Sequence, residues 1–126
     1  MSIPVPVEGL AEAMTGRPYA YLLTVSDDGR PHAVAVTPML ADGALRATVG
    51  RRTASNAQAR SNAVSLVWPP GEVGGYSLIV DGTGSASGDV VEVQPTKAVL
   101  HRPAPADVGP ADADSCGSDC VSVDLG

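Results

Sequence analysis

The segment VGRRTASNAQARSN, residues 49–62, combines residue types that bind anions. Arg51 and Arg52 stand side by side in a chain that has only eight Lys and Arg residues and a net charge of −6. Hydroxyl and amide side chains follow, among them Thr53 and Asn56. A guanidinium fork can bond two phosphate oxygens at once, and the first N–H groups of a helix have no partner within it. The pattern indicates either an anion site suited to phosphate esters or a capped surface helix with solvated arginines.

Turn and strand signals around this segment predict a meander of short antiparallel strands. Asp28-Gly29 and Asp42-Gly43 are typical of tight turns, and a short helix is expected near Thr53 after a strand that ends near Gly50. Residues 89–101 continue either as a strand or, from Thr96, as a short helix. The expected strands are 19–25, 32–40, 44–50, 63–69, 76–88 and 89–101.

These elements predict a mainly β fold, a six-stranded antiparallel split β-barrel with one or two short helices. Closing such a sheet would also remove its exposed edges. The chain divides into an N-terminal lead-in helix within 1–18, a barrel domain over 19–101 and an extended C-terminal tail over 102–126. Residues 120–124 could add a small edge strand.

Composition narrows the class of protein. A length of 126 residues fits one domain, and 14 glycines with 11 prolines suit short strands and turns better than long helices. The apolar residues are mainly Ala, Val and Leu, with no Phe, so we expect a homodimer that buries additional surface. The acidic balance argues against nucleic acid as a partner. With no signal-peptide pattern and no run of about 18 apolar residues, we expect a cytoplasmic protein that does not enter a membrane.

Other reactive side chains give weaker signals. His32 and His101 are the only histidines, and no Ser/His/Asp spacing suggests a catalytic triad. Cys116 and Cys120 could form a redox pair or half of a metal site, but two free thiols are the interpretation we favour, and we predict no metal.

The order of the motifs resembles the split-barrel flavin-binding proteins of the pyridoxamine 5′-phosphate oxidase-like superfamily. The resemblance covers about residues 19–100. It rests on the hairpin DGRPH (28–32), on DGAL (42–45), on the arginine segment, and on VSL (64–66) after it. This sequence departs from the family pattern at the turn within residues 49–62, where the family usually has a basic residue directly after a hydroxyl residue. Here the two arginines precede Thr53.

The resemblance implies a cofactor site between the second and third strands and the strand-to-helix turn. It places the isoalloxazine ring of FMN, or alternatively a deazaflavin, along the strands, and the cofactor phosphate at the turn. Trp68 is included because family sites form at a dimer interface, where it could come from the partner subunit. The implied cofactor-binding residues are His32, Val34, Val36, Thr48, Val49, Gly50, Arg51, Arg52, Thr53, Asn56 and Trp68.

The function that the resemblance implies is hydride transfer between the cofactor and a small organic substrate, with no catalytic side chain identified. The alternative is a non-catalytic split-barrel binding protein that has lost or weakened its cofactor site, which the departure after Thr53 favours. A thiol redox protein based on residues 116–120 is a third possibility.

Overall fold

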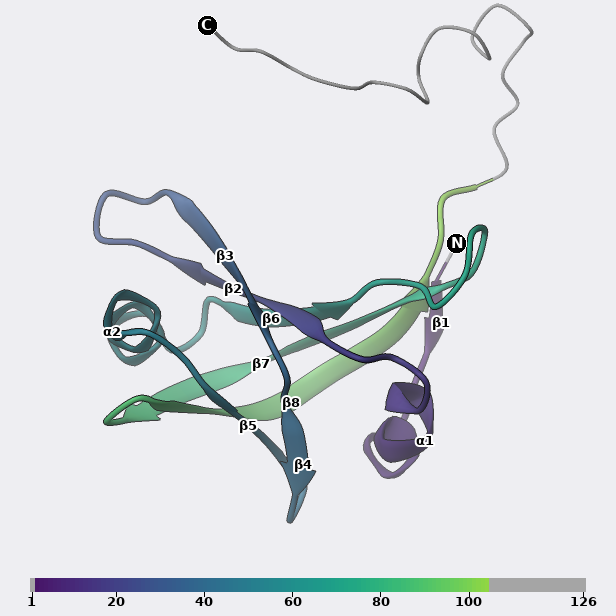
Figure 1. Ribbon diagram of the computed structural model, residues 1–126, viewed down its shortest axis with the longest axis horizontal. Coiled ribbons are helices and arrows are strands. Elements are labelled where there is room, and N and C mark those ends of the chain that lie inside the picture. Colours follow the sequence, from purple (N-terminus) through teal and green to yellow (C-terminus); the bar gives the residue numbers. More distant parts are fainter. Residues whose placement is uncertain (1, 105–126) are drawn as a thin grey trace, which may run out of the picture.

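The structure, a computed structural model, describes residues 2–104 (Figure 1). Cys116, Cys120 and the predicted edge strand at 120–124 lie outside these residues. The described elements in chain order are β1 (Ser2–Pro4), a 3₁₀ turn η1 (Val7–Gly9), α1 (Leu10–Met14), β2 (Ala20–Val25), β3 (Pro31–Val36), β4 (Met39–Ala41), β5 (Ala44–Thr48), α2 (Arg51–Ala59), β6 (Val64–Trp68), β7 (Ser77–Ser87) and β8 (Val90–His101).

The strands form one antiparallel sheet, as predicted, with short helices beside it. The strand order is β3-β2-β6-β7-β8-β5-β4, and β1 also pairs with β8. Within the described residues the sheet therefore has eight strands, two more than predicted, and it is open because β3 and β4 end the series. The predicted strand at 32–40 is divided into β3 and β4 around Pro38, whose nitrogen carries no hydrogen to donate.

The long hairpin of β7 and β8 is the centre of the sheet. Its register shifts at Gly82, which lies opposite Pro95, so that Thr96 is an extra residue in β8. A Cβ atom on Gly82 would lie 2.5 Å from the carbonyl oxygen of Gln94, which explains the glycine. The segment 89–101 is therefore a strand throughout, bulged at Pro95, and not a helix from Thr96.

Side chains alternate across the strands and build the core on one face of the sheet. The core is made of small and medium apolar residues. Among residues 2–104, Trp68 is the one aromatic side chain that is buried. Helix α2 packs against β7 through Ala54 and Ala57. Gly84 of β7 lies beneath Ala57, and a Cβ there would lie 2.9 Å from the side chain of Val64 on the neighbouring strand β6.

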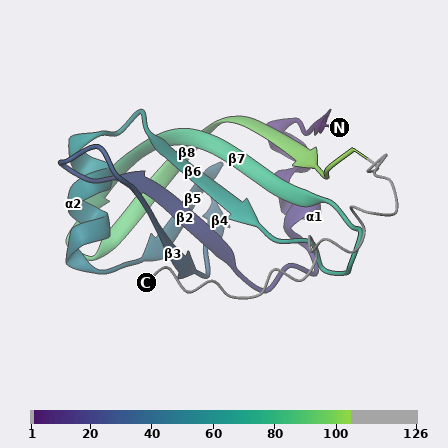
Figure 2. The ribbon, with the colours of Figure 1, turned by 90° about the horizontal axis from the view of Figure 1, so that it is seen from above.

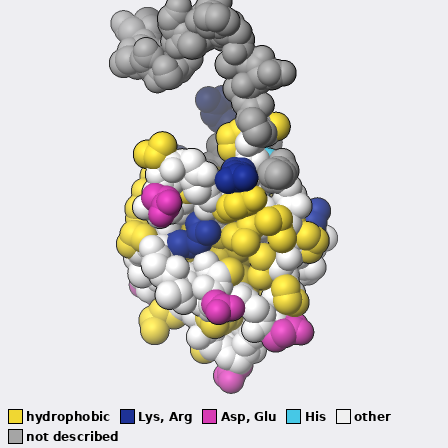
Figure 3. All heavy atoms as spheres, turned by 90° about the vertical axis from the view of Figure 1, so that its right-hand side faces the viewer, with side chains coloured by type: hydrophobic (Ala, Val, Ile, Leu, Met, Phe, Trp, Pro, Cys, Tyr) yellow, Lys and Arg dark blue, Asp and Glu magenta, His cyan; other side chains and the backbone are white. Residues whose placement is uncertain are grey.

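The N-terminal segment joins the sheet, which the sequence did not indicate. Strand β1 pairs with Val99–His101 at the far end of β8, next to the edge that β5 occupies. Helix α1 follows within the predicted range 8–16 and ends before Gly16, which has a φ of 80°. Apolar side chains gather on the surface at this end of the molecule (Figure 3), where Ile3 and Val7 are 45% and 51% exposed.

The two helices lie at opposite ends of the sheet (Figures 1 and 2). Arg17 holds the α1 end, because its Nη1 donates to the carbonyls of Pro69 and Tyr76 at 3.1 and 2.7 Å. Burial lowers the pKa of Arg17. At the other end, α2 lies beside the hairpin of β2 and β3. No helix among residues 2–104 has the length and apolar character needed to cross a bilayer.

Candidate functional site: an arginine-lined cleft

Helix α2 begins two residues earlier than expected, at Arg51, with Gly50 as its N-cap in an extended conformation. The first intrahelical hydrogen bond joins the Ala54 N–H to the Gly50 carbonyl at 3.0 Å. The N–H groups of Arg51, Arg52 and Thr53 therefore have no carbonyl to bond within the helix. The first turn contains no acidic side chain that would neutralise the positive end of the helix dipole.

An open cleft of about 750 Å³ lies between the start of α2 and the β2–β3 hairpin. Its three arginines come from two places in the chain, Arg30 from the hairpin and Arg51 and Arg52 from the helix. They share the cleft with two carboxylates, Asp27 and Asp28, so positive groups outnumber negative ones in the lining. The full lining is Ser26, Asp27, Asp28, Arg30, Pro31, His32, Arg51, Arg52, Ser55 and Asn56.

The hairpin wall of the cleft is a tightly bonded turn. The Ser26 N–H donates to the Arg30 carbonyl, and the Gly29 N–H donates to the Ser26 carbonyl. Hydrogen bonds from the Ser26 hydroxyl and the Arg30 N–H lower the pKa of Asp28, so this carboxylate is ionised at neutral pH. Gly29 has a φ of 84°, which is the left-handed region expected for the Asp28-Gly29 turn.

His32 presents an unsatisfied group on the same wall. Its ring lies on the core face of β3, because His32 is directly opposite Thr24 in the register with β2. The Nδ1 atom is buried and has no hydrogen-bond partner among residues 2–104. A buried polar atom without a partner is costly, and this atom could bond a ligand in the cleft only if the ring turned to bring it to the cleft surface.

Of the eleven predicted site residues, the structure brings four together in the cleft, namely His32, Arg51, Arg52 and Asn56. Asn56 lines the cleft but is only 4% exposed, and its Nδ2 donates to the Thr24 hydroxyl at 3.2 Å. This bond ties α2 to β2.

Four other predicted residues lie outside the cleft lining, on β3 or directly before α2. Val34 and Val36 follow His32 on the core face of β3, opposite Leu22 and Ala20. Val49 and Gly50 connect β5 to α2, and the Val49 N–H donates to the Asp89 carbonyl at 2.8 Å.

Three predicted residues lie elsewhere. Thr53 is buried at 3% exposure within the packing of α2 and does not cap the helix. Thr48 lines a separate hollow of about 320 Å³ beside Met39. Trp68 is buried in the core of its own chain at the opposite end of β6 from α2, where its carbonyl faces Arg17.

Sequence reasoning missed part of the lining, above all Arg30 with Asp27, Asp28 and Ser55. The available signal was the turn at 28–29, which places Arg30 at the tip of a hairpin. The turn did not reveal that helix α2 lies next to that tip. The pairing of β2 with β6, whose chain follows directly after α2, is what brings hairpin and helix together.

Solved structures share this fold at low sequence identity. The FAD binding protein from Mycobacterium smegmatis superposes with a TM-score of 0.61 at 16% identity, covering 81% of this chain and all of the other. A putative pyridoxamine 5′-phosphate oxidase from Listeria innocua gives 0.60 at 14% identity, over 75% and 96% of the two chains. An F420 reductase gives 0.55 at 21% identity, over 69% and 94%. These structures share the fold of this chain, which is the fold that the sequence resemblance implied.

Two curated relatives show the family to which this chain belongs. Uncharacterized protein Mb0449c of Mycobacterium bovis and Uncharacterized protein MT0457 of Mycobacterium tuberculosis are each 44% identical to this chain over 134 aligned positions. Each alignment covers 93% of this chain and 93% of the relative. The chain belongs to the family of these mycobacterial proteins. No family model matches it.

The buried bond between Asn56 and Thr24 leads to a prediction about stability. Replacing Asn56 with Ala leaves the Thr24 hydroxyl, itself only 2% exposed, without this partner. We expect Asn56→Ala to lower the free energy of unfolding by about 1–3 kcal/mol in urea titrations. The matched control is Ser55→Ala, an exposed neighbour on the same helix, which should change it by less than about 0.5 kcal/mol. Equal effects of the two substitutions would contradict a structural role for Asn56.

Proposed function

We propose that this protein binds a flavin-type nucleotide, FMN in the first instance or a deazaflavin, and places its phosphate at the start of α2. The observation that carries the proposal is the convergence of Arg51, Arg52 and Arg30 on one cleft at the N-terminus of a helix. Support also comes from the fold, because similar structures are described as an FAD binding protein and an F420 reductase.

The donors in the cleft suit a phosphate group. Arg51 and Arg52 are both exposed and lie in the first turn of α2, beside N–H groups that have no partner within the helix. Planar guanidinium groups and helix N-termini both favour phosphate oxygens. The cleft volume of about 750 Å³ also falls within the range of about 300–1,000 Å³ that small-molecule sites occupy.

The side of the cleft that β3 forms suits the ring system of such a ligand. Val34 is partly exposed on the core face of β3, next to His32, and could pack against a flat ring system. His32 lines the cleft on the same wall and would form part of the surface beside the ring.

A bound flavin or deazaflavin supplies hydride transfer, which we propose as the reaction with a small organic substrate. The residues of this chain would bind and orient: Arg51 and Arg52 hold the phosphate, and the β3 wall sets the position of the ring.

A comparison of FMN with riboflavin tests the proposal, because riboflavin has the same ring and lacks the phosphate. Charge-assisted hydrogen bonds contribute about 1.5–3 kcal/mol each, so FMN should bind roughly a hundredfold more tightly than riboflavin. The double variant Arg51→Ala/Arg52→Ala should reduce this ratio to near one. Titration by flavin fluorescence measures both affinities, and FAD and F420 extend the series.

The matched control for charge is Lys97→Ala, which removes one exposed positive charge on β8, outside the cleft lining. It should leave the FMN-to-riboflavin ratio unchanged. A ratio near one in the unmodified chain would refute phosphate binding at α2. Failure of every flavin and deazaflavin to bind would favour the alternative of a barrel that has lost its cofactor site.

We also propose that the protein is a homodimer whose subunits meet through the outer face of the sheet. One row of directly paired residues crosses this face from β3 to β8, and every member is apolar. The row consists of Ala35, Tyr21, Val67, Ile79 and Val99. Tyr21 is 40% exposed and meets the neighbouring Tyr19 ring edge-on, with the centroids 5.5 Å apart. A contiguous apolar row on an outer face is typical of protein interfaces.

Sedimentation velocity tests this interface. The unmodified chain should sediment as a dimer, and Val67→Lys, in the middle of the row, should shift it to the monomer because a charge would be buried at the contact. The control is Thr83→Lys, an exposed position on the same outer face of β7 but beyond the row. A dimer that tolerates Val67→Lys would place the interface elsewhere.

A further inference from the structure

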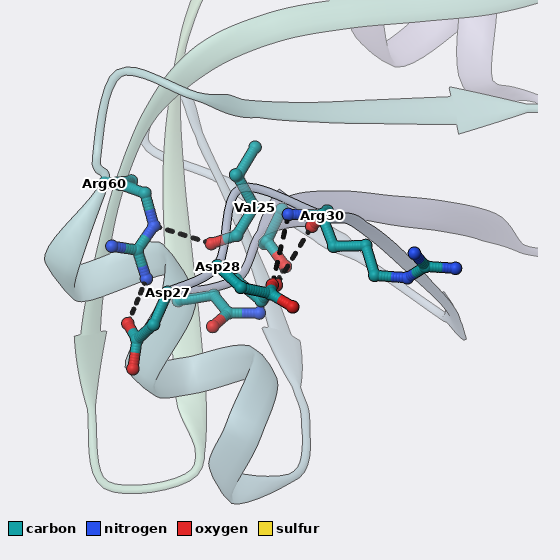
Figure 4. A network of polar contacts seen from close by, with 8 residues as sticks. Val25, Asp27, Asp28, Arg30 and Arg60 are labelled. Atoms are coloured by element: carbon teal, nitrogen blue, oxygen red, sulfur yellow. Dashed lines mark hydrogen bonds and ion pairs between the residues drawn. The ribbon is translucent and has the colours of Figure 1, made fainter.

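Arg60 is the third arginine of residues 49–62, and it does not line the cleft. It is the C-cap residue of α2, and its N–H donates to the Asn56 carbonyl at 2.9 Å. Its side chain turns toward the β2–β3 hairpin (Figure 4). There Nε donates to the Val25 carbonyl at 2.7 Å, and Nη2 donates to the Asp27 carboxylate at 2.6 Å.

These two contacts act on the hairpin wall as a whole. The turn over residues 26–30 is closed by its own backbone hydrogen bonds, so its internal conformation does not need α2. Its position relative to α2 does depend on contacts between the two elements. Arg60 supplies two such contacts at the base and side of the turn, while the Arg30 guanidinium extends away from them (Figure 4).

The exposure of the pair indicates placement more than stabilisation. The Asp27 side chain is 93% exposed and that of Arg60 is 31% exposed. An ion pair this open to water contributes little to the free energy of folding. A pair of hydrogen bonds with fixed geometry can still restrict the motion of one wall of the cleft against the other.

We propose that Arg60 is a positioning residue for the cleft: it clamps the hairpin that carries Arg30 and His32 to the helix that carries Arg51 and Arg52. The inference rests on the proposed flavin-nucleotide function. With the clamp in place, the two walls are already arranged before the ligand arrives, so binding does not have to order the hairpin.

A charge-based explanation would make different predictions, and two variants separate it from positioning. Asp27→Ala removes a negative charge from the cleft, so electrostatics alone predicts tighter FMN binding, whereas loss of the clamp predicts weaker binding. Arg60→Lys keeps the charge but cannot reproduce the two-point contact, so electrostatics predicts no change and positioning predicts weaker binding.

We expect Arg60→Ala, Arg60→Lys and Asp27→Ala each to weaken FMN binding by roughly three- to tenfold, the cost of ordering one or two side chains on binding. Lys97→Ala, which removes a charge outside the cleft, should not change the affinity. NMR relaxation of the backbone amides without ligand gives an independent readout, because it reports motion of the turn as a body even while the hydrogen bonds within the turn stay closed. The amides of 26–30 should show lower order parameters in the Arg60 variants, whereas those of β7 should not.

Unchanged affinity in Arg60→Lys, or tighter binding in Asp27→Ala, would overturn the positioning role. Unchanged order parameters of the hairpin amides in Arg60→Ala would do so as well. If the unmodified chain fails to bind FMN, the proposed function fails, and the relaxation measurement still decides whether Arg60 clamps the hairpin.

Discussion

The hairpin of β7 and β8 is the constraint on which the rest of the molecule depends. Strand β6 pairs with one edge of it and β5 with the other, so the two walls of the cleft are built outward from its opposite sides. The pairing of Thr48 with Val90 determines where β5 ends and α2 begins. On the other side, β6 carries β2 and hence the β2–β3 hairpin. Glycine at 82 and 84 allows this hairpin to pair closely with its own second strand and with β6, since a Cβ at either position would meet atoms of those strands within 3.0 Å.

The start of α2 determines the electrostatic character of the cleft. A helix that starts at Arg51 directs its unbonded N–H groups and two guanidinium groups toward the same space, with no acidic residue in its first turn. Like charges repel and the helix dipole adds to them, and the two carboxylates of the cleft offset this positive charge only in part. In a chain with a net charge of −6, this local concentration of positive charge is the basis of the proposed phosphate site.

The local part of this structure was accessible from the sequence. Paired Asp-Gly turns, β-branched runs and the polar segment after Gly50 correctly predicted an antiparallel sheet with a helix between its strands. Contacts between distant segments were not accessible. Nothing local in residues 2–4 indicates a strand that pairs with 99–101, and the partners of Arg60 lie more than thirty positions away. The burial of Trp68 could not be predicted either, because it depends on which end of β6 lies near α1.

The location of the phosphate in a crystal structure of the FMN complex tests the central claim most directly. The phosphorus atom should lie at the start of α2, with its oxygens bonded by Arg51 or Arg52 and by N–H groups of the first helical turn. The ring should extend toward His32 and Val34 on β3. A phosphate bound at the Thr48 hollow or at the α1 end of the sheet, with the arginine cleft left to solvent, would contradict it.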